Sequence, residues 1–137
     1  MRLSEAGDLL ALISAYDNRH VSEEVSAAWY DLLHPYMLAE AKHAVKKHFN
    51  DSTEYLMPAH LVRILKAERK ARLAKVGTIV SGRADMTDTA TELATTKALT
   101  KAVASGALTP EQYDDYQKGE TPWSTYRRGI LALRGAA

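Results

Sequence analysis

Apolar residues recur at helical spacing through the first half of the chain. Leu9, Leu12, Ile13 and Tyr16 follow one another at the intervals that place side chains on one side of a helix, with polar residues between them. The same spacing predicts three further helices before residue 76. Their apolar stripes are Val25, Ala28, Trp29 and Leu32, with Leu33 beside them; Leu38, Ala41, Val45 and Phe49; and Leu61, Ile64 and Leu65.

Residues that favour helix ends bound these four segments. Ser4 and Ser22 are predicted N-caps, because their hydroxyls can accept a hydrogen bond from the first helical turn. The pair Asp17-Asn18 and residue Pro35 are predicted stops. The third helix is expected over about residues 37–50, and Pro58 is expected as the first residue of the fourth.

The second half of the chain begins with a threonine-rich stretch and then repeats helix-start signals. We expect a flexible linker over residues 76–86, then a helix from about Thr87 to Ser105 that Gly106 ends. The segment Thr109-Pro110-Glu111-Gln112 predicts a capping box and a short helix that ends at Gly119. Thr121-Pro122-Trp123 predicts one more helix start.

These patterns predict an all-α fold, since no stretch of residues 1–75 alternates with the period of a strand. The expected organisation is a small bundle of four helices over residues 5–75, the linker 76–86, and short helices in a C-terminal interaction segment, 87–137. Short helices are marginal in isolation, so a partner is expected to order that last segment.

Composition is that of an ordinary globular domain, with 46% hydrophobic and 26% charged residues among 137. The absence of cysteine excludes disulfides and thiolate metal sites. No apolar run reaches the roughly 20 residues of a membrane helix, so we expect a cytoplasmic protein without a membrane partner. The net charge of +1 hides an asymmetry: residues 1–41 carry an excess of five acidic groups, and residues 42–75 an excess of six basic groups.

Motifs for catalysis or cofactor binding are weak. The two glycines of the segment Gly77–Ala84 have the spacing of a phosphate loop, but Arg83 and Ala84 replace the lysine and the hydroxyl that nucleotide binding requires. The five histidines include no pair four residues apart, so no helix offers two imidazoles to a metal. We therefore expect no enzyme activity, no cofactor and no metal site.

The fourth predicted helix continues as a strongly basic segment. Arg63, Lys66 and Lys70 share one face by their spacing, and Arg69, Arg72 and Lys75 widen it. Such a stripe suits contact with nucleic-acid phosphates, and equally suits a long exposed helix that is merely solvated. A helix-turn-helix formed by the third and fourth helices is disfavoured, because the break over residues 51–57 exceeds the usual turn.

Aromatic and arginine side chains concentrate near the C-terminus. They are the types enriched at the centres of protein interfaces: Tyr113, Tyr116, Trp123, Tyr126, Arg127 and Arg128. Two alternatives stay open at this point. The rings either fold back onto the N-terminal bundle or belong to a separate interaction module, which the threonine-rich stretch between the halves favours.

An ordered series of residues in the first half resembles a known family. It comprises Leu9-Leu10-Ala11-Leu12-Ile13-Ser14-Ala15-Tyr16, Val21-Ser22, Trp29 with Leu32-Leu33, Ala44-Val45-Lys46-Lys47-His48, and Pro58. Over about residues 5–68 the chain is similar to the N-terminal domain of phage loader/inhibitor proteins of DnaB-type hexameric replicative helicases. The resemblance implies a folded helical domain, a flexible C-terminal segment that grips the helicase, no ATPase of its own, and action in the cytoplasm of an infected bacterium.

The family's layout, combined with composition, suggests which residues meet each partner. The expected helicase-binding residues are Tyr113, Tyr116, Trp123, Tyr126, Arg127, Arg128, Ile130, Leu131 and Leu133. The basic fourth helix is the expected contact for single-stranded DNA or an origin-bound initiator. The alternatives are a small DNA-binding regulator that uses helices three and four, and an unrelated adaptor that shares the bundle.

Overall fold

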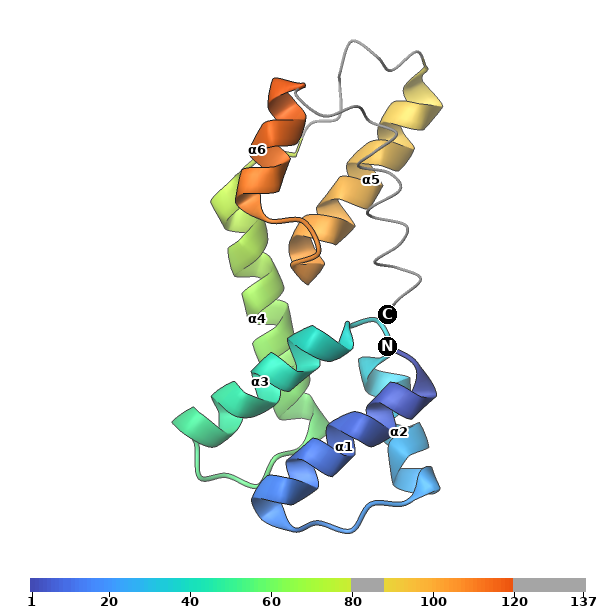
Figure 1. The fold of residues 1–137 in the computed structure, drawn as a ribbon, viewed down its shortest axis with the longest axis vertical. Coiled ribbons are helices and arrows are strands. Elements are labelled where there is room, and N and C mark those ends of the chain that lie inside the picture. The colour runs from blue at the N-terminus through green and yellow to red at the C-terminus, as the bar shows by residue number, and fades with distance from the viewer. Residues whose placement is uncertain (80–87, 120–137) are drawn as a thin grey trace. The chain divides into compact units, whose positions relative to one another are not determined.

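The computed structural model describes residues 1–79 and 88–119, and within these ranges the fold is all-α, without a strand (Figure 1). The helices are α1 (Leu3–Asp17), α2 (Glu23–Leu33), α3 (Leu38–Asp51), α4 (Pro58–Val76), α5 (Thr89–Ser105) and α6 (Pro110–Lys118). The helix predicted from residue 121 onward and most of the predicted linker lie outside the described residues. Of the helices described, none has both the length and the apolar character needed to cross a membrane.

Two compact units divide the chain, and the division falls inside α4. The first unit is Met1–Ala67, and the second begins at Glu68. The sequence places the boundary later, at residues 76–86. The structure differs because Leu73 and Val76 pack against the core of the second unit. The basic segment of α4 is therefore not merely an exposed, solvated helix.

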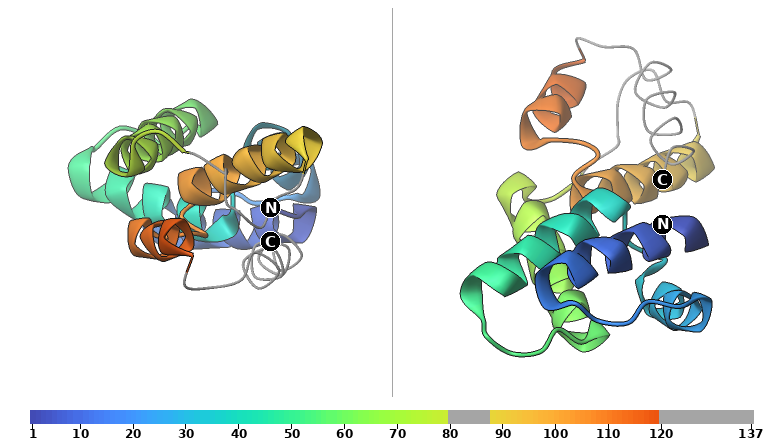
Figure 2. Two further views of the ribbon diagram at one scale, coloured as in Figure 1. Left: turned by 90° about the horizontal axis from the view of Figure 1, so that it is seen from above. Right: turned by 60° about the horizontal axis from the view of Figure 1, so that its bottom comes forward.

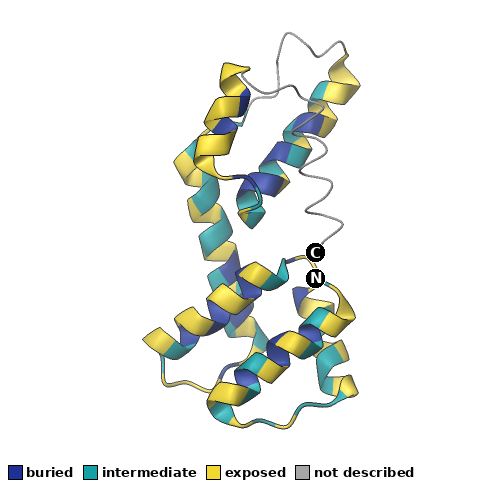
Figure 3. Cartoon of the chain, in the orientation of Figure 1, coloured by how far each residue is buried: buried dark blue, intermediate teal, exposed yellow. Residues whose placement is uncertain are grey.

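The first unit buries one side of each of its helices (Figure 3). Helix α1 packs against both α2 and α3, as the further views also show (Figure 2). The core consists of Leu9, Leu10, Ile13, Trp29, Leu33, Tyr36, Ala41, Ala44, Val45, Leu56, Leu61 and Leu65. All four helices contribute to it, and their arrangement as a four-helix bundle stays a prediction.

Local sequence signals account for most helix ends in this unit. The hydroxyl of Ser22 accepts a hydrogen bond from the Val25 amide, which confirms the predicted N-cap of α2. Pro58 is the first residue of α4, as predicted. The N-cap of α1 is Arg2, two residues before the predicted Ser4. The backbone amide of Arg2 donates a hydrogen bond to Glu5 Oε2 at 2.7 Å.

The apolar stripes predicted for α1 and α2 are wider than the faces that become buried. Tyr16 and Leu32 are 52% and 55% exposed, and Ala28 also faces solvent. Conversely, Leu10 on α1 is fully buried, although the stripe did not include it. Periodicity predicts the direction of the apolar face, but the neighbouring helices decide how much of that face is covered.

The second unit has a core of its own. Leu99, Ala102 and Val103 of α5 lie there with Leu108, and the rings of Tyr113 and Tyr116 from α6 complete it. The predicted ends are confirmed: Gly106 and Gly119 cap α5 and α6 in the left-handed conformation, and Thr109 forms a capping box with Gln112. The N-cap of α5 is Asp88, and the hydrogen bond from the Thr91 amide lowers the pKa of its carboxyl.

Candidate binding surfaces

The cations of α4 do not form the single broad stripe that the sequence predicts. Arg63 and Lys66 in the first unit are exposed, and so are Lys70 and Lys75 in the second. Arg69 and Arg72 are half-buried, so they do not widen this stripe.

Arg72 has a structural role within the second unit. Its Nε donates to the carbonyl oxygen of Ala104 at 2.7 Å, and its guanidinium lies against Gly106. Carbonyls in the last turn of a helix lack partners within the helix, and a cation there also suits the negative end of the helix dipole. Arg72 therefore caps the C-terminus of α5, and its assignment as a nucleic-acid contact stays a prediction.

Two of the aromatic residues assigned to helicase binding are covered by this chain. Tyr113 is 7% exposed and Tyr116 is fully buried, and their ring centroids lie 6.3 Å apart. The hydroxyl oxygen of Tyr113 accepts a hydrogen bond from Gln117 Nε2 at 2.8 Å. These two rings are therefore buried in the core of the second unit and are not available as exposed anchors for a helicase. The other assigned residues lie outside the described ranges: Trp123, Tyr126, Arg127, Arg128, Ile130, Leu131 and Leu133.

The tertiary fold brings together two histidines that the spacing analysis kept apart. The ring centroids of His48 on α3 and His60 on α4 lie 5.0 Å apart, and His48 is only 4% exposed. His48 Nε2 donates to the Glu54 carbonyl at 2.8 Å, while His60 Nδ1 accepts from the Met57 amide at 3.0 Å. His60 Nε2 lies 3.2 Å from Glu54 Oε2.

These bonds give the histidine pair a structural task. They tie His48 on α3 and His60 on α4 to Glu54 and Met57 in the connection between the two helices. Among the described residues, no group of three or more potential ligands is placed to hold a metal ion. The phosphate-loop segment falls mostly outside these residues, so the structure adds nothing about it.

Arg19 is held between rings from two different segments. Its guanidinium carbon lies 4.3 Å from the ring centroid of Tyr55 and 5.4 Å from that of Trp29. Its Nε donates to Asp17 Oδ2 at 2.9 Å, and Nη2 bonds the same oxygen. The hydrogen bonding of Arg19 lowers the pKa of the Asp17 carboxyl. This arrangement fixes the α1–α2 loop against the α3–α4 connection.

The sequence analysis also missed a row of lysines and aromatic rings on α3 and the end of α1. Lys42, Lys46 and Phe49 lie four and three residues apart, which places them on one side of the helix. The ring of Phe49 stacks on that of Tyr16 from α1, with 4.8 Å between centroids and 21° between planes. We call these four residues the lysine–aromatic row. The missing signal was the contact between α1 and α3, which periodicity within one helix does not contain.

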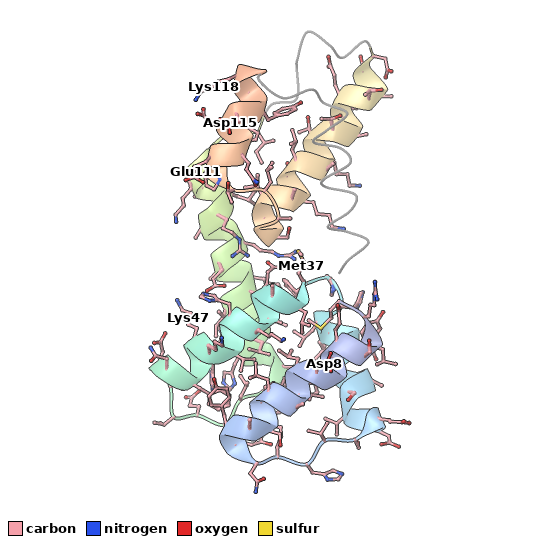
Figure 4. The ribbon with its side chains drawn as sticks, viewed as in Figure 1. Asp8, Met37, Lys47, Glu111, Asp115 and Lys118 are labelled. Carbon is pink, nitrogen blue, oxygen red and sulfur yellow. The ribbon has the colours of Figure 1, made fainter. Side chains whose placement is uncertain are left out.

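Lys47 widens the basic character of α3. It extends from the helix on the side away from α1 (Figure 4). Within the described part of the chain, no ion pair joins a carboxylate to Lys42, Lys46, Lys47, Arg63 or Lys66. The first unit therefore presents five exposed cations whose charge is not neutralised by a direct partner.

Comparisons with known proteins identified no relative of this chain. A scan against family models, a search of curated proteins and a search of solved structures each found no match.

Proposed function

We propose that this chain is a phage DNA-replication accessory protein that binds a DnaB-type hexameric replicative helicase and loads or inhibits it, without ATPase activity. The observation that carries the proposal is the position of the residues behind the resemblance. Leu9, Ile13, Trp29 and Val45 lie in a single core, and Pro58 begins the last helix of that core. Part of the resemblance therefore concerns the framework of a domain, whereas Tyr16, Leu32, Lys46 and Lys47 of the same series are exposed.

The two-unit organisation also supports this proposal. The unit that carries the resemblance is followed by a second unit with its own core, and then by a segment rich in Trp, Tyr, Arg and Leu. Because Tyr113 and Tyr116 are buried, we assign helicase binding to the remaining residues of the original set. These are Trp123, Tyr126, Arg127, Arg128, Ile130, Leu131 and Leu133.

The mechanism is one of binding. An amphipathic segment anchored by aromatic side chains would occupy a groove on each helicase subunit. Several copies around a six-fold ring would raise the overall avidity well above the affinity of one contact. Loading further requires different affinities for open and closed rings, because equal affinity shifts no equilibrium. An origin-bound initiator is the second partner expected for a loader.

A strand-separation assay tests this function. Titrating the full chain against a purified DnaB-type helicase should change the rate of unwinding at near-stoichiometric ratios. The double variant Trp123→Ala, Tyr126→Ala should need a concentration at least tenfold higher for the same effect, since interface aromatics often contribute about 2 kcal/mol or more. The double variant Leu32→Ala, Leu93→Ala, at side chains that are 55% and 67% exposed, is the matched control. An equal effect of the double variant and the unchanged chain would reject the assignment.

A DNA-binding regulator is the second candidate, and the exposure of Arg63 and Lys66 favours it. The helix-turn-helix form of this idea is not supported, because α3 ends at Asp51 and α4 begins only at Pro58. A regulator should bind duplex DNA with strong salt dependence and lose that binding in the double variant Arg63→Ala, Lys66→Ala. It should also leave helicase unwinding unchanged, which separates it from the first candidate.

A further inference from the structure

The lysine–aromatic row combines the two features that single-stranded nucleic acids require of a protein surface. Lysines along a helix contact successive phosphates, and an exposed ring gives an unpaired base a surface on which to stack. Lys42 and Phe49 are separated by seven residues, so the row extends for about 10 Å along α3. It begins with two cations and ends at the Tyr16–Phe49 ring pair.

Each part of the row is accessible. Lys42 and Lys46 are exposed and, among the residues that the structure describes, neither forms an ion pair with a carboxylate. Tyr16 is 52% exposed although its ring rests on Phe49. About half of the Tyr16 surface is therefore accessible while its ring is stacked on that of Phe49.

We propose that the lysine–aromatic row binds single-stranded nucleic acid, with phosphates on Lys42 and Lys46 and a base on the ring of Tyr16. A duplex suits the row less well, because its bases are already stacked on one another and cannot reach a protein ring without being turned out. A protein partner also suits it less well. The exposed positions of α3 beside the row are Ala39, His43 and Asn50, which make no large apolar patch.

Charge on α1 sets the direction in which the strand can leave the row. Asp8 is exposed on α1 two turns before Tyr16, about 12 Å along that helix. Its carboxylate repels phosphates at the N-terminal half of α1, whereas the ring pair lies at the C-terminal ends of α1 and α3. The strand is therefore expected to follow α3 from the lysines to the rings and not to continue along α1.

Fluorescence anisotropy on the full chain tests this inference without any helicase, so it can fail independently of the proposed function. The probes are a labelled oligothymidylate of about twenty nucleotides, an oligouridylate of equal length and a duplex of equal length. Binding of either single strand supports the inference, and a preference between them identifies DNA or RNA as the ligand. The duplex should bind at least about fivefold more weakly than the better single strand.

Two sets of variants separate the lysines from the ring. In the double variant Lys42→Ala, Lys46→Ala, the slope of log K against log salt should fall in magnitude by about 1.4, since each single-strand phosphate contact contributes about 0.7. The matched control removes the same charge from exposed positions of α5, as Lys97→Ala with Lys101→Ala, and should leave the slope unchanged.

For the ring, Tyr16→Ala should weaken binding about five- to tenfold at constant salt, because stacking of one base on a ring is lost. Tyr16→Phe keeps the stacking surface and should bind like the unchanged chain. Circular dichroism of each variant shows whether the helices are retained. The inference is overturned if neither single strand binds, if the α3 and α5 lysine variants have equal slopes, or if Tyr16→Ala and Tyr16→Phe bind equally.

Discussion

Leu99 provides a direct test of the second core, because the same helix offers a matched control. Leu99 on α5 is fully buried among Val103, Tyr113 and Tyr116, whereas Leu93, six residues earlier on α5, is 67% exposed. Replacing either by alanine removes the same atoms from the same helix. Any difference between the two variants therefore reports burial and not helix propensity.

The expected magnitudes differ several-fold. Leu99→Ala removes a fully buried side chain and leaves a cavity, which costs about 2 to 5 kcal/mol. Leu93→Ala should change the free energy of unfolding by less than about 0.5 kcal/mol. The second unit, Glu68–Ala136, would have a total stability on the order of 3 to 10 kcal/mol, so the loss at Leu99 is a large share of it.

Hydrogen–deuterium exchange measured by mass spectrometry is the appropriate assay, because it reports each helix separately. In Leu99→Ala, peptides from α5 and α6 should exchange at rates near those of unfolded chain. Peptides from α1, α2 and α3 should keep their protection, since the first core does not include Leu99. Equal exchange in the Leu99 and Leu93 variants would refute the second core, and loss of protection throughout α1–α3 would refute the separation of the cores.

The remaining predictions concern one ion pair and two glycines. Hydrogen bonding by Arg19 holds the pKa of Asp17 below its usual 3.8, so the pair stabilises the fold above that pH and loses its contribution as pH falls through the lowered pKa. The unchanged chain should thus resist urea better than Asp17→Asn at pH 7, and this difference should shrink as the pH is lowered below 3.8; a difference of equal size at every pH would contradict this. In Gly7→Ala, inside α1, the new methyl group makes an ordinary van der Waals contact with Ser26 Oγ at 3.8 Å, and the change should raise stability by about 0.5 to 1 kcal/mol. Gly106→Ala places a side chain on a residue with φ +80° and should lower stability by about 1 kcal/mol. The thermal unfolding temperatures of Gly7→Ala and Gly106→Ala should therefore shift in opposite directions, and shifts of the same sign would contradict these backbone conformations.

Local chemistry in the sequence was sufficient for most helix ends. Ser22, Pro58 and Thr109 each begin a helix because the group that satisfies the first turn is the residue itself or lies within three positions. Gly106 and Gly119 end helices in the left-handed conformation, which costs glycine little free energy because it has no side chain. Such signals are complete within a few residues and need no knowledge of the fold.

Features that depend on a second helix could not be predicted in this way. Arg72 is one cation in a basic run by sequence, but the position of α5 makes it a helix cap. His48 and His60 are twelve residues apart, and only the packing of α3 and α4 brings their rings together. The contact between Tyr16 and Phe49 likewise depends on α1 lying beside α3.

The tyrosines of α6 show that amino-acid composition alone does not distinguish a buried core residue from an interface residue. Tyrosine serves equally in a core and at an interface, because its ring is apolar and its hydroxyl needs only one partner. On α6 the hydroxyl of Tyr113 finds that partner in Gln117, four residues later, and the ring can then be buried. Residue type alone could not distinguish this from an interface anchor.

The mass of the complex with a DnaB-type hexameric helicase tests the central claim most directly. Light scattering on the eluted mixture should give a mass above that of the hexamer by a whole number of 15.1 kDa chains. The increment should persist in the double variant Leu32→Ala, Leu93→Ala and disappear in the double variant Trp123→Ala, Tyr126→Ala at the same concentrations. A mass equal to that of the helicase alone with the unchanged chain, or an undiminished increment with the double variant, would contradict the account.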